Sequence, residues 1–297
     1  ILMVLLIIAG GLLSLLWYIV APIYIIYKWF KEGRDPKGTV GVVSSWFDPP
    51  KSTKTNRFLT PGEVGGLGDE TVDLKDIAST IIDLARRGYL TIKEKSKKDF
   101  YLIKTDKAES AGTNNMMKFE KKILDGFFKS KSEVRLKTAK LYDEVEKVKK
   151  ELYIALVDEG LFPHNPQSVR TLYYVIGFFA LFTFNLFLAV VALTFGRFMP
   201  RKTVDGVNAK NVSLSLRNFL TSQSRQLKFQ ASKQMMFERL LPYAVAFGVE
   251  KVWAKRFENI NLKTPEWYSG YGTSSRFNSL IFVNSMNSSM KSFSRAA

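Results

Sequence analysis

Few residues of this 297-residue chain have the types and spacing that chemistry requires. The chain has no cysteine, which excludes disulfides, thiolate catalysis and Cys-ligated zinc or iron–sulfur sites. Its one histidine, His164, lies between two prolines, a setting typical of a solvated turn. The acids Asp69, Glu70 and Asp73 have no spacing that separates them from surface carboxylates. The sequence therefore predicts no enzyme, no metal site and no cofactor.

The glycine-rich stretch at residues 62–69 shares only its glycines with a phosphate-binding loop. No Gly-Lys-Ser/Thr follows it, and no strong strand precedes it. The acidic Glu63, Asp69 and Glu70 would repel a nucleotide. The stretch is predicted to be a flexible link between helices.

Basic and aromatic side chains remain as candidates for recognition, and they fall at a helix end, at a strand turn and in the C-terminal part. No small-molecule ligand can be identified from them. The candidate interaction residues are Arg86, Arg87, Lys95, Lys97, Lys98, Trp253, Trp267 and Tyr268.

Residues 58–165 are predicted to form the module that positions the first five of these. Thr60 can cap a helix, with Pro61 at its first position and Glu63 three residues after the cap. Apolar residues then recur at helical spacing from residue 73 until Gly88 ends the helix. Two strands follow, at residues 89–95 and 99–105, and then two amphipathic helices, at 117–128 and 141–160. Helix, helix and a two-stranded wing resemble a winged-helix domain.

A winged helix raises the alternative of DNA binding by the helix at residues 73–87. Its predicted exposed face carries Asp76, Ser79, Asp83, Arg86 and Arg87. Two carboxylates there would oppose phosphates, and Asp83 and Arg87 can pair with each other. A solvated face or a protein-contact module is favoured over nucleic acid.

Residues 1–27 contain no charged residue and no histidine, so they are predicted to be a transmembrane helix. Aromatic residues gather at the C-terminal end, and basic residues follow. A signal peptide fits less well, because the run lacks a basic start and a small-residue cleavage site. Residues 28–57 are predicted to be a linker with an extended segment at 39–47.

Residues 171–196 form a second uncharged stretch, read as a membrane segment. Its length suits one tilted span, but residues 28–170 carry 28 basic and 22 acidic residues, and residues 197–297 carry 16 and 5. Because positive flanks favour the cytoplasmic side, a re-entrant hairpin that leaves both flanks inside is preferred. Against it, the middle of the stretch has no Pro or Gly to turn the chain.

Residues 199–270 are predicted to be a small helical C-terminal part. Pro242 can start a helix that runs to about Glu258, with Trp253 in its apolar stripe. That helix suits packing in a small domain better than a membrane surface. The Ser- and Asn-rich tail, residues 271–297, is predicted to be disordered.

Several stretches, in order along the chain, resemble the YciQ-like predicted membrane proteins, a bacterial family of unknown function. They are Gly33-Arg34-Asp35-Pro36, the run from Ala85 to Leu90, Met199 to Thr203, Arg239 to Phe257, and Pro265-x-Trp267-Tyr268-x-Gly270. The resemblance implies a bacterial inner membrane protein with an extracytoplasmic domain before Ile1 and paired later spans. It supplies no catalytic residues.

The sequence as a whole predicts a mainly α membrane protein with an N-terminal transmembrane helix and a cytoplasmic α+β module. Its expected function is to couple an outer domain to cytoplasmic protein partners, with the lipid bilayer as its surroundings. The alternative is a membrane-tethered winged-helix regulator that binds DNA.

Overall fold

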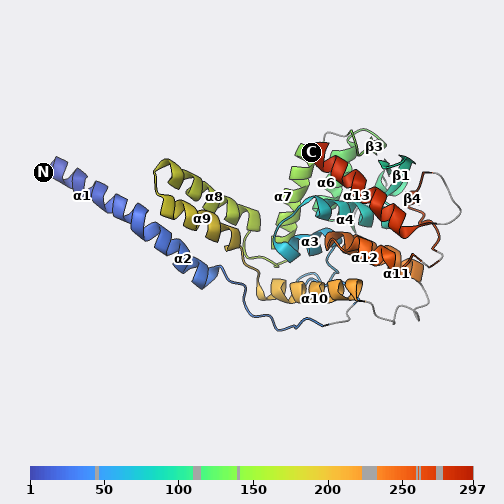
Figure 1. Cartoon of the computed structure of the whole chain (residues 1–297), viewed down its shortest axis with the longest axis horizontal. Helices are drawn as coiled ribbons and strands as arrows, with labels where there is room; N and C mark the ends of the chain where they lie inside the picture. Colours follow the sequence, from blue (N-terminus) through green and yellow to red (C-terminus); the bar gives the residue numbers. More distant parts are fainter. Residues whose placement is uncertain are drawn as a thin grey trace. The chain divides into compact units, whose positions relative to one another are not determined.

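A computed structural model describes residues 1–43, 47–109, 115–138, 141–222, 233–258, 260, 262–271 and 277–296. The chain forms two compact units (Figure 1). The anchor unit comprises residues 1–39 and 160–207, and the module comprises residues 40–159 and 208–297. The boundary at residue 207 falls within helix α10 (Val204–Thr221).

The anchor unit begins with a continuous apolar helix. It consists of α1 (Leu2–Leu15), a π-helical stretch η1 (Leu16–Val20) and α2 (Ala21–Glu32). Together these run from Leu2 to Glu32 and are, among the described residues, the one helix long and apolar enough to cross a membrane. The mean hydropathy of its most apolar window is 2.5, and none of that window is buried.

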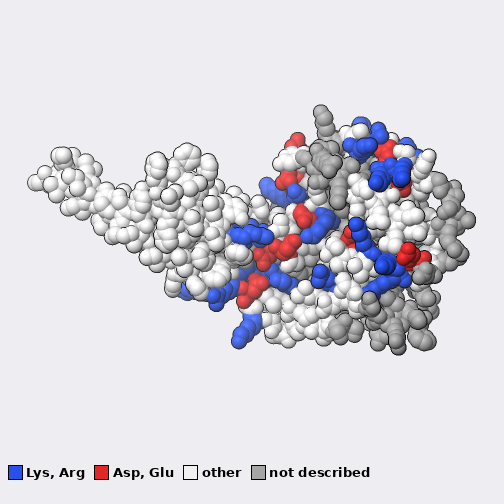
Figure 2. Space-filling model, viewed as in Figure 1, with Lys and Arg blue, Asp and Glu red and all other residues white. Residues whose placement is uncertain are grey.

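The second apolar stretch is a helical hairpin. Helix α8 (Pro166–Phe182) and helix α9 (Leu186–Phe198) pack against each other, and α9 also packs against α2. In Figure 2 the visible surface of this part of the chain has neither blue nor red atoms over most of its length. The shared core of the three helices is apolar and includes Ile25, Tyr173, Ala180, Leu188, Ala189 and Ala192.

The module is built around a four-stranded sheet with the order β3-β2-β1-β4. Strands β1 (Leu90–Ser96) and β2 (Asp99–Lys104) form the predicted antiparallel hairpin, and β3 (Glu133–Arg135) pairs with β2. Strand β4 (Tyr268–Ser269) pairs in parallel with β1, through Ile92 and Lys93. The sheet therefore joins segments that lie before and after the α8–α9 hairpin in the sequence.

The helix start predicted at Thr60 and the three later helices predicted for the first half of the module are present. They are α3 (Pro61–Asp69), α4 (Leu74–Arg86), α6 (Lys118–Phe128) and α7 (Tyr142–Asp158), with a short α5 (Asp106–Glu109). Thr60 and Glu63 form the expected capping box at the start of α3. The remaining helices of the module are α11 (Lys233–Ala246), α12 (Glu250–Lys255) and α13 (Ser279–Ala296).

The glycine-rich stretch is a buried helix, so its prediction as a flexible link was wrong. Glycines let α3 approach its neighbours closely. A Cβ at Gly65 would lie 1.8 Å from Asp76 Oδ1, and one at Gly62 would lie 2.4 Å from Thr80 Oγ1. The capping box and Pro61 start the helix despite its poor helix formers.

Three further expectations differ from the structure. Residues 39–43 and 47 form no strand, while residues 44–46 lie outside the described part. Pro242 lies inside α11 instead of starting a helix, and a second helix, α12, follows after Gly248, whose φ is +67°. The predicted disordered tail contains α13, because Phe282 and Val283 provide an apolar face that is buried in the module.

Candidate functional site

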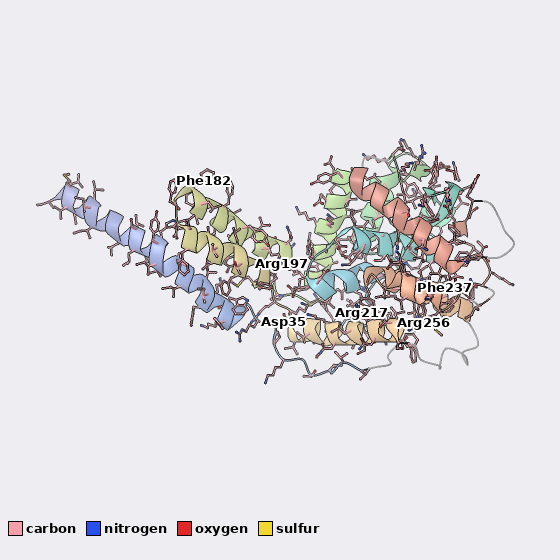
Figure 3. The ribbon with its side chains drawn as sticks, viewed as in Figure 1. Asp35, Phe182, Arg197, Arg217, Phe237 and Arg256 are labelled. Carbon is pink, nitrogen blue, oxygen red and sulfur yellow. The ribbon has the colours of Figure 1, made fainter. Side chains whose placement is uncertain are left out.

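The turn between α8 and α9 is formed without Gly or Pro. The Asn185 N–H donates to Ala180 O at 2.9 Å, and the Phe184 N–H donates to Leu181 O at 3.1 Å. This pair of bonds is a Schellman motif, which requires a left-handed residue, and Phe184 takes that place with φ +54°. Figure 3 shows Phe182 at this end of the hairpin and Arg197 toward the other end of α9.

Asn185 connects the turn to the middle of the apolar helix. Its Oδ1 accepts from Leu188 N at 3.0 Å and so caps α9, while its Nδ2 donates to Trp17 O at 2.7 Å. In η1 the Ala21 N–H bonds to Leu16 O, five residues back. The next N–H in that register would belong to Pro22, which has none. The Asn185 amide therefore satisfies a carbonyl that the helix itself leaves open.

Two more contacts complete this arrangement. Trp17 Nε1 donates to Thr183 Oγ1 at 2.8 Å, and Tyr18 OH donates to Thr183 O at 2.5 Å. We call Trp17, Tyr18, Thr183 and Asn185 the turn cluster. Polar groups in apolar surroundings need hydrogen-bond partners, and these contacts supply them. One sequence signal indicates the cluster, an Asn in the middle of an apolar stretch.

Arg86 and Arg87 lie at the end of α4 and are held by ion pairs inside the module. Arg86 Nη2 lies 2.8 Å from Asp83 Oδ1, and Arg87 Nε lies 3.0 Å from Asp83 Oδ2. Arg87 also pairs with Glu120. Burial raises the pKa of the Glu120 carboxyl, against the lowering effect of Arg87. Both arginines are therefore neutralised by neighbouring carboxylates.

The predicted exposed face of α4 is buried, so that expectation was wrong. Asp76 and Ser79 are fully buried, and Asp83 is 5% exposed. Helices α3 and α11 both pack against α4. The hydroxyl of Ser79 donates to Asp76 O, at 2.8 Å, so this polar side chain is satisfied within its own helix.

The lysines of the wing lie at the β1–β2 turn. Lys97 and Lys98 are exposed, and Lys98 takes a left-handed conformation with φ +62°. Its backbone N–H donates to Glu94 Oε1 at 2.8 Å. Lys95 pairs with Glu133 and lies over the Tyr101 ring, 4.1 Å from its centroid. The turn thus keeps two outward lysines, while Lys95 bridges β1 to β3.

The three aromatic candidates are core residues, not surface contacts. Trp253 is fully buried, and its Nε1 donates to Phe237 O at 3.4 Å. Trp267 Nε1 donates to Glu238 Oε2 at 2.8 Å. Tyr268 OH donates to Glu94 Oε2 at 2.9 Å; burial and the Glu94 carboxylate raise the pKa of this tyrosine. Tyr268 therefore attaches the C-terminal segment to β1, while the two tryptophans bond to α11.

A cavity of about 400 Å³ brings two sequence stretches together beside β1. One wall comes from the end of α4 and the start of β1, the other from α11 and the segment before β4. It presents charges of both signs, so it favours no single class of ligand. Its lining includes Arg86, Leu90, Glu238, Lys263, Glu266 and Trp267.

His164 is exposed. Among the described residues, no group of three or more His, Cys, Asp or Glu side chains could hold a metal ion.

Asp76 is a buried carboxyl with a strongly perturbed pKa. Its Oδ2 accepts from Asp73 N at 2.9 Å, whereas its Oδ1 has no hydrogen-bond partner within the described residues. Burial raises the pKa of Asp76 well above its usual value, and the nearby Asp73 raises it further. The folded module therefore holds a proton that the unfolded chain releases above about pH 4.

We expect the module to lose stability as the pH rises from about 4 toward the folded pKa of Asp76. Stability is present below the unfolded pKa and falls by up to about 1.4 kcal/mol per pH unit in this window. Asp76→Asn should reduce this slope in urea unfolding curves measured between about pH 4.5 and 7.5, leaving the part that the raised pKa of Glu120 contributes. Glu146→Gln, at an exposed carboxylate, is the matched control and should keep it. Parallel curves for Asp76→Asn and the unmodified chain would contradict the assignment.

Comparison with known proteins gives one match. The model of a family described as "Predicted membrane protein (DUF2207) C-terminal domain" matches residues 46–257, more than two thirds of the chain. No curated protein and no solved structure matches the chain. The match agrees with the resemblance to a predicted membrane protein family, while the narrower YciQ-like name is not part of it.

Proposed function

We propose, since the chain belongs to the family of predicted membrane proteins with a DUF2207 C-terminal domain, that it anchors a single interaction module on the cytoplasmic face of a membrane. The anchor is the apolar helix together with a re-entrant hairpin. The module is the folded unit that contacts protein partners.

One observation carries this proposal: β4, which follows the hairpin in sequence, pairs with β1, which precedes it. The pairing is supported by the Tyr268 hydroxyl, which bonds to Glu94, and by the packing of α11 against α4. One folded unit cannot lie on both sides of a bilayer. The hairpin must therefore enter and leave on the same side.

The depth of the hairpin supports re-entry over two full crossings. Trp29 Nε1 donates to Phe198 O, at 3.1 Å, near the base of the hairpin, while Trp17 contacts its turn. Twelve residues separate these two tryptophans, which is about 18 Å of helix. A hydrocarbon core is about 30 Å thick. The turn would thus stop little more than half way across.

Charge supports the cytoplasmic side for the module. Residues on both flanks of the hairpin are net positive, with 28 basic against 22 acidic before it and 16 against 5 after it. Basic segments are retained on the cytoplasmic side of membranes. Charge thus supports the cytoplasmic location of the module. The pairing of β4 with β1 independently supports a hairpin whose two ends lie on one side of the membrane.

Single-cysteine labelling tests this topology cleanly, because the chain has no cysteine of its own. The variants are Ser96→Cys and Ser269→Cys in the module, and Phe184→Cys at the turn, where the side chain is 86% exposed. A membrane-impermeant maleimide should label the two module sites in inside-out vesicles and not in right-side-out vesicles. It should label Phe184→Cys in neither.

Ser168→Cys, exposed in the first turn of α8, is the control for the hairpin base and should label with the module sites. Labelling of Phe184→Cys from the opposite side would establish two full crossings and exclude re-entry. Labelling of Ser96→Cys and Ser269→Cys from different sides would contradict the single module.

Within the module, we propose that α3, α4 and the β1–β2 wing form a winged-helix-like arrangement that serves protein contact. The two outward lysines, Lys97 and Lys98, are its most accessible basic groups among the candidate residues. The DNA-binding alternative is not favoured, since the face of α4 that would read DNA is covered by α3 and α11.

A further inference from the structure

The anchor unit has very different cross-sections along its length. Near α2, three helices pack around one core, to which Trp17, Ile26 and Trp29 of the apolar helix contribute partly buried side chains. Beyond the turn cluster, α1 is the only described element of this unit. None of its residues is buried. The unit is therefore broad in one half and narrow in the other.

We propose that this shape makes the anchor unit a wedge, which favours membranes curved so that the leaflet containing the hairpin is convex. The partner is the lipid bilayer itself, recognised by its curvature. The inference rests on the re-entrant topology proposed above, and it adds a function to that topology.

The size of the asymmetry follows from helix dimensions. A helix with short side chains is about 10 Å wide and so occupies about 80 Å² of a leaflet. Three helices against one give an excess of about 160 Å² in the hairpin leaflet. Lipids in the hairpin leaflet must spread around the larger inclusion. Bending of the bilayer toward the opposite leaflet relieves the difference in occupied area between the two leaflets.

The side chains that face lipid increase this excess. The hairpin exposes large aromatic rings, with Phe178 62%, Phe182 68% and Phe187 57% exposed. Phe178 and Phe182 pack edge to face, with their centroids 4.9 Å apart, so they form one bulky surface. On α1 the exposed side chains include the smaller Leu5, Ile8 and Leu12.

The test measures sorting between a giant vesicle and a thin tube, about 20 nm in radius, pulled outward from it. The full chain carrying Ser269→Cys is reconstituted, and an impermeant dye marks the copies whose module faces outward. Their hairpins lie in the outer leaflet, which is convex in the tube. We expect these copies to be about twofold denser in the tube than in the vesicle.

Two comparisons distinguish sorting caused by the wedge shape of the anchor unit from sorting caused by the size of the module. Copies with the module inside, labelled by a permeant dye after outer thiols are blocked, should be depleted in the tube. Replacing Phe178, Phe182 and Phe187 by Ala narrows the hairpin and should reduce the enrichment. The matched variant with Leu5, Ile8 and Leu12 replaced by Ala narrows the opposite half and should maintain or increase it.

Equal sorting of both orientations, or equal loss of sorting in both triple variants, would overturn the wedge. Labelling at Phe184→Cys and Ser269→Cys is measured on the same preparations. If that labelling fits re-entry while sorting is flat, the wedge alone is wrong. If Phe184→Cys labels from the far side, the proposed topology itself is wrong.

Discussion

Replacing Asn185 by Leu is expected to destabilise the packing of the hairpin on the apolar helix by about 2–4 kcal/mol. The variant loses the cap of α9, worth about 1 kcal/mol, and leaves the Trp17 carbonyl without its partner inside the membrane, at a further cost of about 1–3 kcal/mol. Both contacts come from the same side chain, through Oδ1 to Leu188 N and Nδ2 to Trp17 O.

The opening of the hairpin can be followed through one thiol. Ala189 is 1% exposed within the core of the anchor unit, so Ala189→Cys should be protected until the hairpin separates. Its labelling rate in mixed micelles with increasing SDS reports the free energy of that local opening. Asn185→Leu should raise this rate by a factor of about 30 to 800, the range that follows from about 2–4 kcal/mol.

Asn165→Leu is the matched control. Asn165 caps α8 through Oδ1, which accepts from Gln167 N at 2.9 Å, but its amide nitrogen has no hydrogen-bond partner among the described residues. Asn165→Leu should therefore destabilise the hairpin only by the loss of this cap, about 1 kcal/mol. An Asn185→Leu effect no larger than this would contradict the role assigned to the Trp17 carbonyl.

Pro22→Ala tests why that carbonyl is open. Alanine restores a backbone N–H, which can bond to Trp17 O within the helix. In the Pro22→Ala background, Asn185→Leu should cost less by about 1–2 kcal/mol, a coupling that a double-mutant cycle isolates. An unchanged cost would show that Pro22 and Asn185 act independently.

Replacing Gly65 by Ala is expected to destabilise the module by about 3 kcal/mol or more, at the upper end of overpacking effects. The added Cβ would lie 1.8 Å from Asp76 Oδ1 and 2.7 Å from its Cγ. Asp76 cannot easily move away, because its Oδ2 accepts from Asp73 N in the capping box of α4. Helices α3 and α4 would have to separate.

Gly68→Ala is the control in the same helix, since a Cβ there meets no atom within 4 Å. Its better helix propensity should stabilise the module by up to about 1 kcal/mol. Urea unfolding of both variants in mild detergent, followed by far-UV circular dichroism, gives the comparison. Equal stability of the two variants would contradict the close contact between α3 and α4.

Local sequence patterns were sufficient to predict much of the secondary structure in the first half of the module. The apolar spacing in α4, α6 and α7 and the Thr60 capping box predicted helices that the structure contains. These features depend on neighbouring residues, so the sequence displays them directly. The face of α4 predicted to be exposed was wrong, because its surroundings come from a segment that is distant in the sequence. Its burial depends on α11, more than 140 residues later in the chain.

The same limit applies to the candidate residues. Trp253, Trp267 and Tyr268 were among the candidate interaction residues, yet the structure buries them. Their partners, Phe237, Glu238 and Glu94, are defined only by the tertiary fold. The hairpin turn was also hard to predict, since Phe184 adopts a left-handed conformation that is unusual for its residue type.

The pairing of β4 with β1 has a consequence for biosynthesis. Glu94 and Tyr268, which bond across it, are 174 residues apart. At roughly 5–20 residues per second, a ribosome needs about 9 to 35 seconds to make that interval. During this time the first part of the module has neither its parallel strand nor α11. In the topology proposed above, the hairpin between them enters the membrane in the same interval. Completion of the module therefore waits for synthesis of the hairpin and of the segments that follow it, and one edge of β1 is without its partner strand until then.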